Sequence, residues 1–249
     1  MTLQGRISPL SVGTLALLLA VGYGMVRGRM SLEAPESCDP PSDAACAPVA
    51  AVTGARAAPS SIAAAEICGD SGYLCADLEE SERFIIRRWK ELDGALVVHV
   101  PRPDFEDAGH ALELQRAAVL GVRAWNNQPF PILVDTRGDR EAHFSVAWRH
   151  SLSGTQIGMA RTRWSPAEGL RVTSLELTTR NPFNPAQVSA ALQVRLTAAH
   201  EMGHALGLPH SDTARDVMYP TNTATAVSAR DRRTMEVLYG LADGTEIVR

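Results

Sequence analysis

The sequence lacks an excess of positive charge and contains a single lysine, Lys90. Its 249 residues include 24 Lys and Arg against 28 Asp and Glu, which gives a formal net charge of −4. The isoelectric point is about 6.0. A nucleic-acid-binding domain usually shows a basic patch or a high isoelectric point, so we expect no nucleic-acid partner. We draw no functional conclusion from the preference for arginine, for which a compositional bias of the source genome is the simpler explanation.

Cysteine is also scarce, and its four residues all lie in the first third of the chain, at Cys38, Cys46, Cys68 and Cys75. Neither close-spaced pair has the C-x-x-C spacing of a metal site, which disfavours a second metal centre. Two local disulfides, Cys38–Cys46 and Cys68–Cys75, are the simplest arrangement. Four cysteines allow three connectivities, and the alternatives stay open.

The first residues form a predominantly apolar segment over 7–26. Its length is just sufficient to span a bilayer. Its glycines and short leucine-rich centre favour a signal peptide. Arg27 and Arg29 directly after it, and the lack of a clear Ala-x-Ala cleavage site, favour an uncleaved anchor. Both interpretations stay open, and both predict export.

Composition divides the chain into three segments. Residues 1–29 are predicted to be a signal peptide or an N-terminal membrane anchor. Residues 30–80 are rich in Ala, Pro and Ser and have few large apolar side chains, which predicts a linker that holds both cysteine pairs. Residues 81–249 are predicted to form the folded domain.

Within the domain, segments with the apolar pattern of a strand follow one another in turn with segments that have apolar residues at helical spacing. We predict strands at 96–100, 132–134, 144–148, 157–163 and 170–179, and in the last of these the apolar phase shifts between Val172 and Leu175, which indicates a bulge. Helices are predicted at 107–126, 186–206 and 228–240, separated in part by a loop at 181–185. The second helix should present Leu192, Leu196 and Ala199 as its apolar stripe. Segment 77–89 fits a helix or a strand. Ser228 is the expected N-cap of the last helix, with Asp231 at its third position. This order predicts an α/β (α+β) fold.

The most informative stretch is His200-Glu201-Met202-Gly203-His204, followed by Gly207 and His210. Two histidines four residues apart lie one turn apart on one helix face, where both rings can bind one metal ion. Gly207 can end the helix in a left-handed conformation, and Pro209 prevents its continuation. The chain then turns and brings His210 back to the metal. Three imidazoles with an open fourth position are typical of catalytic zinc.

With Met218 in the segment Val217-Met218-Tyr219-Pro220, this pattern resembles the metzincin metalloproteases. Ser211 after the third histidine, and the ending Leu238-Tyr239-Gly240, make the sequence most similar to the matrixin family, over roughly 83–241. The resemblance implies a twisted, mostly parallel sheet with three helices, in which a turn around Met218 follows the active-site helix. It also implies one catalytic zinc ion held by His200, His204 and His210, with Glu201 as the general base. Met218 would form an apolar floor without binding the metal.

The same resemblance implies that the edge strand around Gly158, Met159 and Ala160 pairs with an extended peptide substrate. A purely structural edge strand is the alternative. The wall after the Met-turn would include Pro220 and Asn222. Matrixins usually have Pro-x-Tyr there, and without the aromatic residue the usual pocket specificity of the family is not carried over to this chain. The remaining histidines do not form the His-x-Asp pattern of a structural zinc site, and no pattern assigns calcium ligands, so calcium stays open.

These observations predict a secreted or membrane-tethered zinc-dependent endopeptidase. The alternative is a binding module on an inactive metzincin scaffold in the cell envelope. The intact ligand set and Glu201 argue against that alternative. A peptidase that acts on one dedicated envelope protein also stays open. We expect a monomer whose partners are peptides or proteins, with membrane contact through the N-terminal segment alone.

Overall fold

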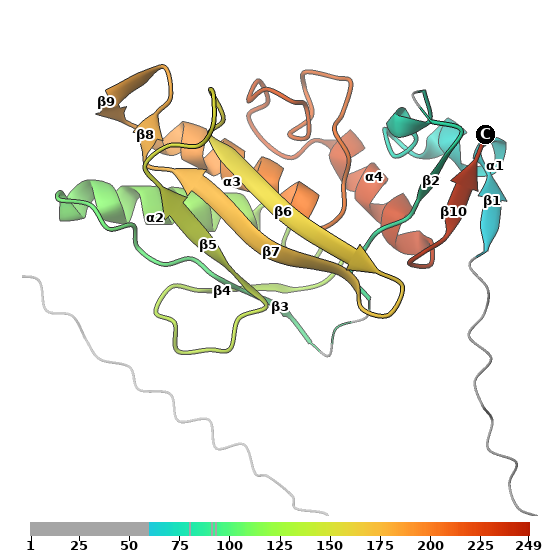
Figure 1. Ribbon diagram of the computed structural model, residues 1–249, viewed down its shortest axis with the longest axis horizontal. Helices are drawn as coiled ribbons and strands as arrows, with labels where there is room; N and C mark the ends of the chain where they lie inside the picture. Colours follow the sequence, from blue (N-terminus) through green and yellow to red (C-terminus); the bar gives the residue numbers. More distant parts are fainter. Residues whose placement is uncertain (1–59, 80, 91, 93) are drawn as a thin grey trace, which may run out of the picture. The chain divides into compact units, whose positions relative to one another are not determined.

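The structure of this protein is a computed structural model that describes residues 60–79, 81–90, 92 and 94–249 (Figure 1). The apolar segment 7–26, the Cys38–Cys46 pair and most of the predicted linker lie outside the described residues.

The domain is built on a five-stranded sheet in the order β4-β3-β5-β7-β6. β3 (Leu96–His99) is parallel to β4 (Ile132–Asp135) and to β5 (Phe144–Arg149). β5 is parallel to β7 (Gly169–Thr178), whereas β6 (Gly158–Ser165) is antiparallel to β7. The mostly parallel sheet implied by the family resemblance is confirmed, and β6 forms one edge of it.

The bulge predicted in the last long strand is present in β7. Arg161 pairs with Ser174, and the next residue, Thr162, pairs with Val172. Thr173 is therefore an extra residue in β7. Side chains alternate between the two faces of a strand, so one inserted residue moves all later side chains to the opposite face. This explains why the apolar phase of the sequence shifts at this point.

Two long helices, α2 (Ala108–Arg123) and α3 (Ala191–Ala205), lie side by side on the same side of the sheet (Figure 1). Asp107 caps α2 by accepting hydrogen bonds from the backbone N–H groups of Gly109 and His110. The last helix, α4 (Ala229–Gly240), begins with the predicted cap. The Ser228 side chain accepts from the Asp231 N–H, and the Asp231 side chain accepts from the Ser228 N–H.

The predicted start of α3 and its apolar stripe were partly wrong. The helix begins at Ala191, five residues later than predicted. Leu196 and Ala199 are buried, but the side chain of Leu192 in the first turn is 60% exposed. The buried face instead runs through Val194, Ala198, Met202 and Ala205. Leu192 lines an open surface pocket between the first turn of α3 and α2, so a residue in phase with the stripe is still exposed.

The predicted loop 181–185 is a small hairpin of β8 (Arg180–Asn181) and β9 (Asn184–Val188). The Asn181 side chain accepts a hydrogen bond from the Phe183 N–H at 3.0 Å. This local bond favours a turn over a helix start. β9 therefore occupies residues that the sequence analysis assigned to the helix.

The linker prediction for residues 30–80 was wrong for its last part, because the domain is already folded at Ser61. β1 (Ser61–Ala63) pairs in parallel with β10 (Glu246–Val248), and β10 pairs with β2 (Arg83–Ile85). Between β1 and β2 lie α1 (Ala64–Ile67) and two 3₁₀ turns, η1 (Cys68–Asp70) and η2 (Ala76–Glu79). Segment 77–89, left open from sequence, thus contains the end of a 3₁₀ turn followed by a short strand. Tyr73 and Leu74 join the main core, so a few large side chains anchor a segment whose average composition is that of a linker.

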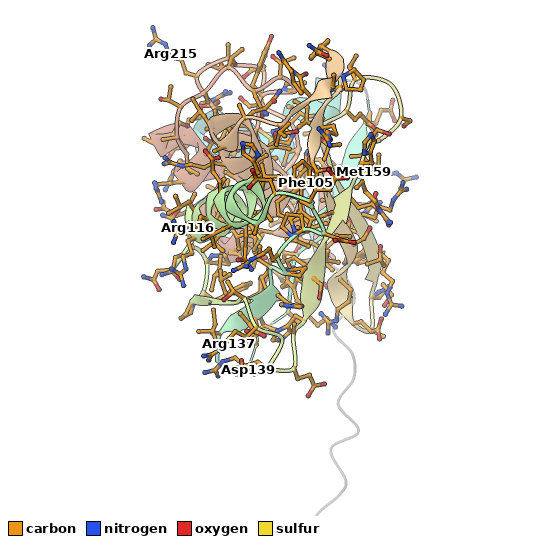
Figure 2. The ribbon with its side chains drawn as sticks, turned by 90° about the vertical axis from the view of Figure 1, so that its left-hand side faces the viewer. Phe105, Arg116, Arg137, Asp139, Met159 and Arg215 are labelled. Atoms are coloured by element: carbon orange, nitrogen blue, oxygen red, sulfur yellow. A yellow bond between two sulfur atoms is a disulfide. The ribbon has the colours of Figure 1, made fainter. Side chains whose placement is uncertain are left out.

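Cys68 and Cys75 form the predicted local disulfide. Throughout residues 60–79, 81–90, 92 and 94–249, no helix combines the length and the apolar character needed to cross a bilayer. Charged side chains project from loops at the two ends of the view in Figure 2, with Arg137 and Asp139 at one end and Arg215 at the other. Arg137 and Asp139 form an ion pair at 2.8 Å.

Candidate metal centre and substrate cleft

The metal-binding geometry starts with the end of α3. Gly207 has a φ of +103°, and a Cβ atom there would lie 2.4 Å from the Arg87 carbonyl oxygen. Both the backbone conformation and the available space therefore require glycine. The N–H of Leu208 donates to the Gly203 carbonyl at 3.0 Å, which closes the last turn. The chain then reverses over Pro209 and brings His210 back beside the helix.

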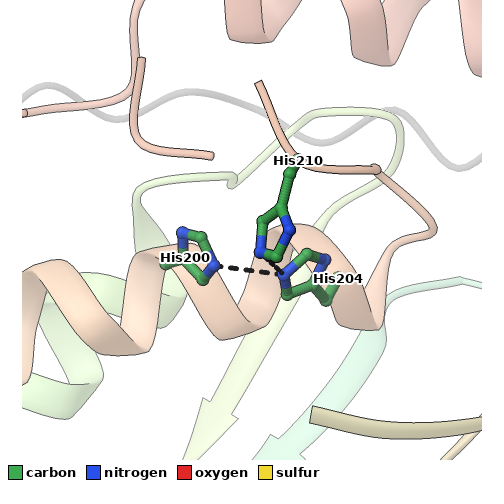
Figure 3. Close-up of side chains that lie close together, drawn as sticks. All are labelled: His200, His204 and His210. Carbon is green, nitrogen blue, oxygen red and sulfur yellow. Dashed lines mark hydrogen bonds between the residues drawn. The ribbon is translucent and has the colours of Figure 1, made fainter. Parts of the chain in front are cut away.

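The three histidines predicted as ligands converge on one point (Figure 3). The Nε2 atom of His204 lies 3.1 Å from that of His200 and 3.1 Å from that of His210. Nitrogen atoms around a tetrahedral zinc ion with bonds of about 2.0–2.1 Å are separated by about 3.3–3.4 Å. The observed separations are close to that value, so the three rings fit a zinc ion without rearrangement of the chain.

Hydrogen bonds to backbone carbonyls fix the tautomers of two of the rings. The Nδ1 atom of His200 lies 2.7 Å from the Val217 carbonyl oxygen, and the Nδ1 atom of His204 lies 2.9 Å from that of Leu208. A carbonyl can only accept, so each Nδ1 donates and each neutral ring presents the lone pair of Nε2 to the centre. Converging lone pairs repel one another unless a cation lies between them. The donor chemistry is therefore that of a metal site.

Burial keeps these two rings in the neutral form that binds metal. It lowers the pKa of His200, and it lowers the pKa of His204 to about 3, where the neighbouring His200 contributes in the same direction. Protons then compete weakly with a metal ion for Nε2 near neutral pH.

Glu201 lies beside the histidines with its side chain almost entirely buried. One carboxylate oxygen accepts a hydrogen bond from the Ala160 N–H of β6 at 2.7 Å. Burial raises the pKa of Glu201 to about 7, although the Ala160 bond acts in the opposite direction. A carboxyl group with this pKa can both take up and release a proton near neutral pH, as a general base requires.

Close packing places β6 against this part of α3. A Cβ atom at Gly158 would lie 2.4 Å from the Thr197 methyl carbon and 2.9 Å from a Glu201 carboxylate oxygen. Glycine is therefore needed for the strand to approach the helix. Because the Ala160 N–H points at Glu201, it points away from β7. By strand alternation, the backbone groups of Gly158 face the same open edge.

Met218 packs against α3 and is fully buried. A Cβ atom at Gly203 would lie 2.2 Å from the Met218 sulfur, so this glycine lets the Met-turn pack directly on α3. The Ser211 N–H donates to the Met218 carbonyl at 2.9 Å and ties the turn to the segment that carries His210. The apolar floor implied for Met218 matches this position.

The family model of matrixin matches residues 79–240, which is most of the described chain. The chain belongs to the matrixin family. Matrixins are zinc-dependent metalloproteases, and the three-histidine group of this chain could hold a metal ion. A comparison with curated proteins found no match.

In this matrixin a cleft of ≈ 600 Å³ opens over the histidines. Its lining includes the three ligands and Glu201, together with the five residues that the family resemblance placed at the substrate, namely Gly158, Met159, Ala160, Pro220 and Asn222. β6 and the segment after the Met-turn thus form the two sides of one cleft, although they lie about sixty residues apart in sequence.

Thr197 also lines this cleft, although it was not among the residues predicted from sequence. Thr197 lies one turn before His200 on the same helix face, and its hydroxyl accepts a hydrogen bond from the Asn222 side-chain amide at 2.6 Å. The bond ties the cleft wall to α3 at the position where matrixins usually have tyrosine in the wall. The i, i+3 spacing from His200 was a usable signal for the helix face, but the partner Asn222 could not be inferred from it.

Proposed function

We propose that this matrixin is an exported zinc-dependent endopeptidase. The observation that carries the proposal is the convergence of three Nε2 atoms beside the buried Glu201 carboxylate, inside a cleft bordered by an open strand edge. A zinc ion held by His200, His204 and His210 would supply Lewis acidity, activating water and polarising the peptide carbonyl.

Glu201 provides the proton chemistry. Its carboxylate takes a proton from the attacking water and then delivers it to the nitrogen of the leaving amine. The Ala160 N–H orients the carboxylate through one oxygen, which leaves the other available for this transfer. In the metal-free protein burial raises the pKa of Glu201 to about 7, and this effect of burial favours uptake of the proton in the first step.

The substrate is proposed to bind as an added strand along β6. No described strand pairs with the outer edge of β6. The Ala160 N–H on this edge is held by Glu201, and the other outward backbone groups, including those of Gly158, are the ones proposed to pair with the substrate. Main-chain hydrogen bonds to such an edge give affinity for many sequences, and side-chain pockets give selectivity. The hydrogen-bonded Thr197–Asn222 pair makes the wall of the cleft polar beside the reacting bond.

Export is supported by the Cys68–Cys75 disulfide, because structural disulfides persist mainly in oxidising compartments. Segment 7–26 would act as a signal peptide, or as an anchor oriented with the domain outside the cytosol.

The test is cleavage of a peptide library by the full chain, analysed by mass spectrometry. Three samples are compared: zinc-loaded protein, chelated protein, and chelated protein after zinc is restored. We expect cuts at internal peptide bonds in the first and third samples and none in the second. If zinc-loaded protein binds library peptides but cuts none, the chain is a binding module on a matrixin scaffold and the proposal fails.

A further inference from the structure

The disulfide-closed segment 68–75 reaches the metal centre through a buried tyrosine. Tyr73 is 2% exposed, and its hydroxyl donates to an Asp231 carboxylate oxygen at 2.8 Å. Asp231 lies on α4 and is 0% exposed. Burial raises the pKa of the Tyr73 hydroxyl, and the Asp231 charge raises it further, so the group remains a donor.

Asp231 in turn binds the backbone of the Met-turn, the segment that contains Val217 and Met218. One carboxylate oxygen accepts from the Val217 N–H at 2.8 Å, and the other accepts from the Met218 N–H at 3.4 Å. The same carboxylate also accepts from the Ser228 N–H at 2.8 Å, which completes the cap of α4. Asp231 therefore does more than cap α4. Its carboxylate also fixes the position and orientation of the two peptide groups whose N–H groups belong to Val217 and Met218.

Val217 joins Asp231 directly to one of the three histidines. The Val217 carbonyl is the acceptor for His200 Nδ1 at 2.7 Å. A partner on the far nitrogen of a metal-binding histidine sets the tautomer and the ring orientation. An unbroken path of hydrogen bonds thus runs from Tyr73 through Asp231 and Val217 to His200.

Contacts other than the Tyr73 hydroxyl dock the segment on α4. The Tyr73 N–H donates to the Thr234 hydroxyl at 3.3 Å, and Arg230 donates to the Gly72 carbonyl at 3.1 Å. A Cβ atom at Gly72 would lie 2.1 Å from the Thr234 hydroxyl oxygen, so the backbone approaches α4 closely. The segment can therefore stay docked when the tyrosine hydroxyl alone is removed.

We propose that Tyr73, presented by the loop that Cys68–Cys75 closes, is a positioning residue for the metal centre, holding Asp231 so that the Met-turn keeps His200 oriented for zinc. The inference rests on the proposed zinc ligands but not on peptidase activity. The disulfide contributes because it restricts the conformations of the loop and so raises the fraction of molecules with Tyr73 docked.

The test compares zinc affinity in wild type, Tyr73→Phe and the double variant Cys68→Ser/Cys75→Ser, all as full chains. Gln115→Met is the matched control, because it loses a buried hydrogen bond to the Val100 carbonyl and touches no part of the path. We expect Tyr73→Phe to raise the Kd for zinc about tenfold, as changes behind metal ligands commonly do. The visible spectrum of the cobalt-substituted protein should shift as well. The double cysteine variant should show a smaller increase in Kd.

Gln115→Met should lower the melting temperature with an unchanged Kd and an unchanged cobalt spectrum. If Tyr73→Phe keeps the wild-type Kd within twofold and the wild-type spectrum, the hydroxyl contributes only to packing and the proposal is overturned. A Kd that rises equally in Tyr73→Phe and Gln115→Met would overturn it too, because the effect would then follow stability alone.

A measurement on wild type keeps the proposal testable if Tyr73→Phe does not fold. Coupling between two sites is reciprocal, so zinc must favour docking of Tyr73 by the same factor. Hydrogen exchange in β3 reports global unfolding and measures how much zinc stabilises the whole domain. On zinc binding, exchange in segment 68–75 should slow about tenfold more than exchange in β3. Equal slowing in the two segments would refute the coupling, whereas absent peptidase activity would leave this result unaffected.

Discussion

Replacement of Glu201 by glutamine separates proton transfer from metal binding. The amide keeps the size of the side chain and an oxygen that can accept the 2.7 Å hydrogen bond from the Ala160 N–H. It loses the basicity. A general base contributes roughly 10² to 10⁴ in rate, which corresponds to about 3 to 5 kcal/mol of barrier. We therefore expect peptide turnover to fall by that factor while zinc stays bound.

The structure also predicts the effect of this change on stability. Burial raises the pKa of Glu201 from 4.5 to about 7 in the folded, metal-free protein. The folded state therefore disfavours the charged form. The free energy of unfolding therefore begins to fall as the pH rises above 4.5. The loss is complete above pH 7, where it amounts to about 3 kcal/mol. A neutral glutamine does not carry this cost. Metal-free Glu201→Gln should thus unfold at a higher temperature than metal-free wild type at pH 8, with little difference at pH 4.

Two assays decide the matter: zinc content by metal analysis, and turnover of a peptide that the wild type cleaves. Near-normal turnover in the glutamine variant would refute the role of Glu201 as base. Loss of zinc would show that the carboxylate supports the metal instead. A melting temperature that falls at pH 8 would contradict the inferred cost of burying the charge.

Other changes give equally direct outcomes. His204→Ala should lose zinc and activity together, since the central ligand of the three is removed, and retention of zinc by metal analysis would contradict the ligand assignment. Gly158→Ala should cost about 1–3 kcal/mol of unfolding free energy through overpacking against α3, and it should reduce turnover. Gly240→Ala is its control, because a Cβ atom there meets nothing within 4 Å, and denaturant unfolding compares the two. Peptide mapping of protein from its native location should recover the Cys68–Cys75 disulfide, and free thiols at both positions would contradict export to an oxidising compartment.

Several elements of the fold could be predicted from local sequence patterns. Short apolar runs located β3 and β4, alternation located β5, and the phase shift between Val172 and Leu175 located the bulge in β7. The capping box of α4 was readable at Ser228 and Asp231 because its two hydrogen bonds join residues only three apart. The start of α3 was misplaced because a hydrogen bond across the turn at Asn181, together with the pairing of β8 with β9, outweighed helix propensity.

The sequence by itself determined which three histidines converge to offer a metal site, His200, His204 and His210. The spacing of His200, His204 and Gly207 acts through one helix and its end, so the geometry follows from 3.6 residues per turn and one left-handed glycine. Tertiary structure decided everything that joins distant segments. It brought β6 to within a hydrogen bond of Glu201, and it folded residues 60–79 onto β10 and α4 although their composition predicts a linker. Contacts such as Tyr73 with Asp231 join residues 158 positions apart, and no periodic pattern records them, because they depend on how separately formed elements pack.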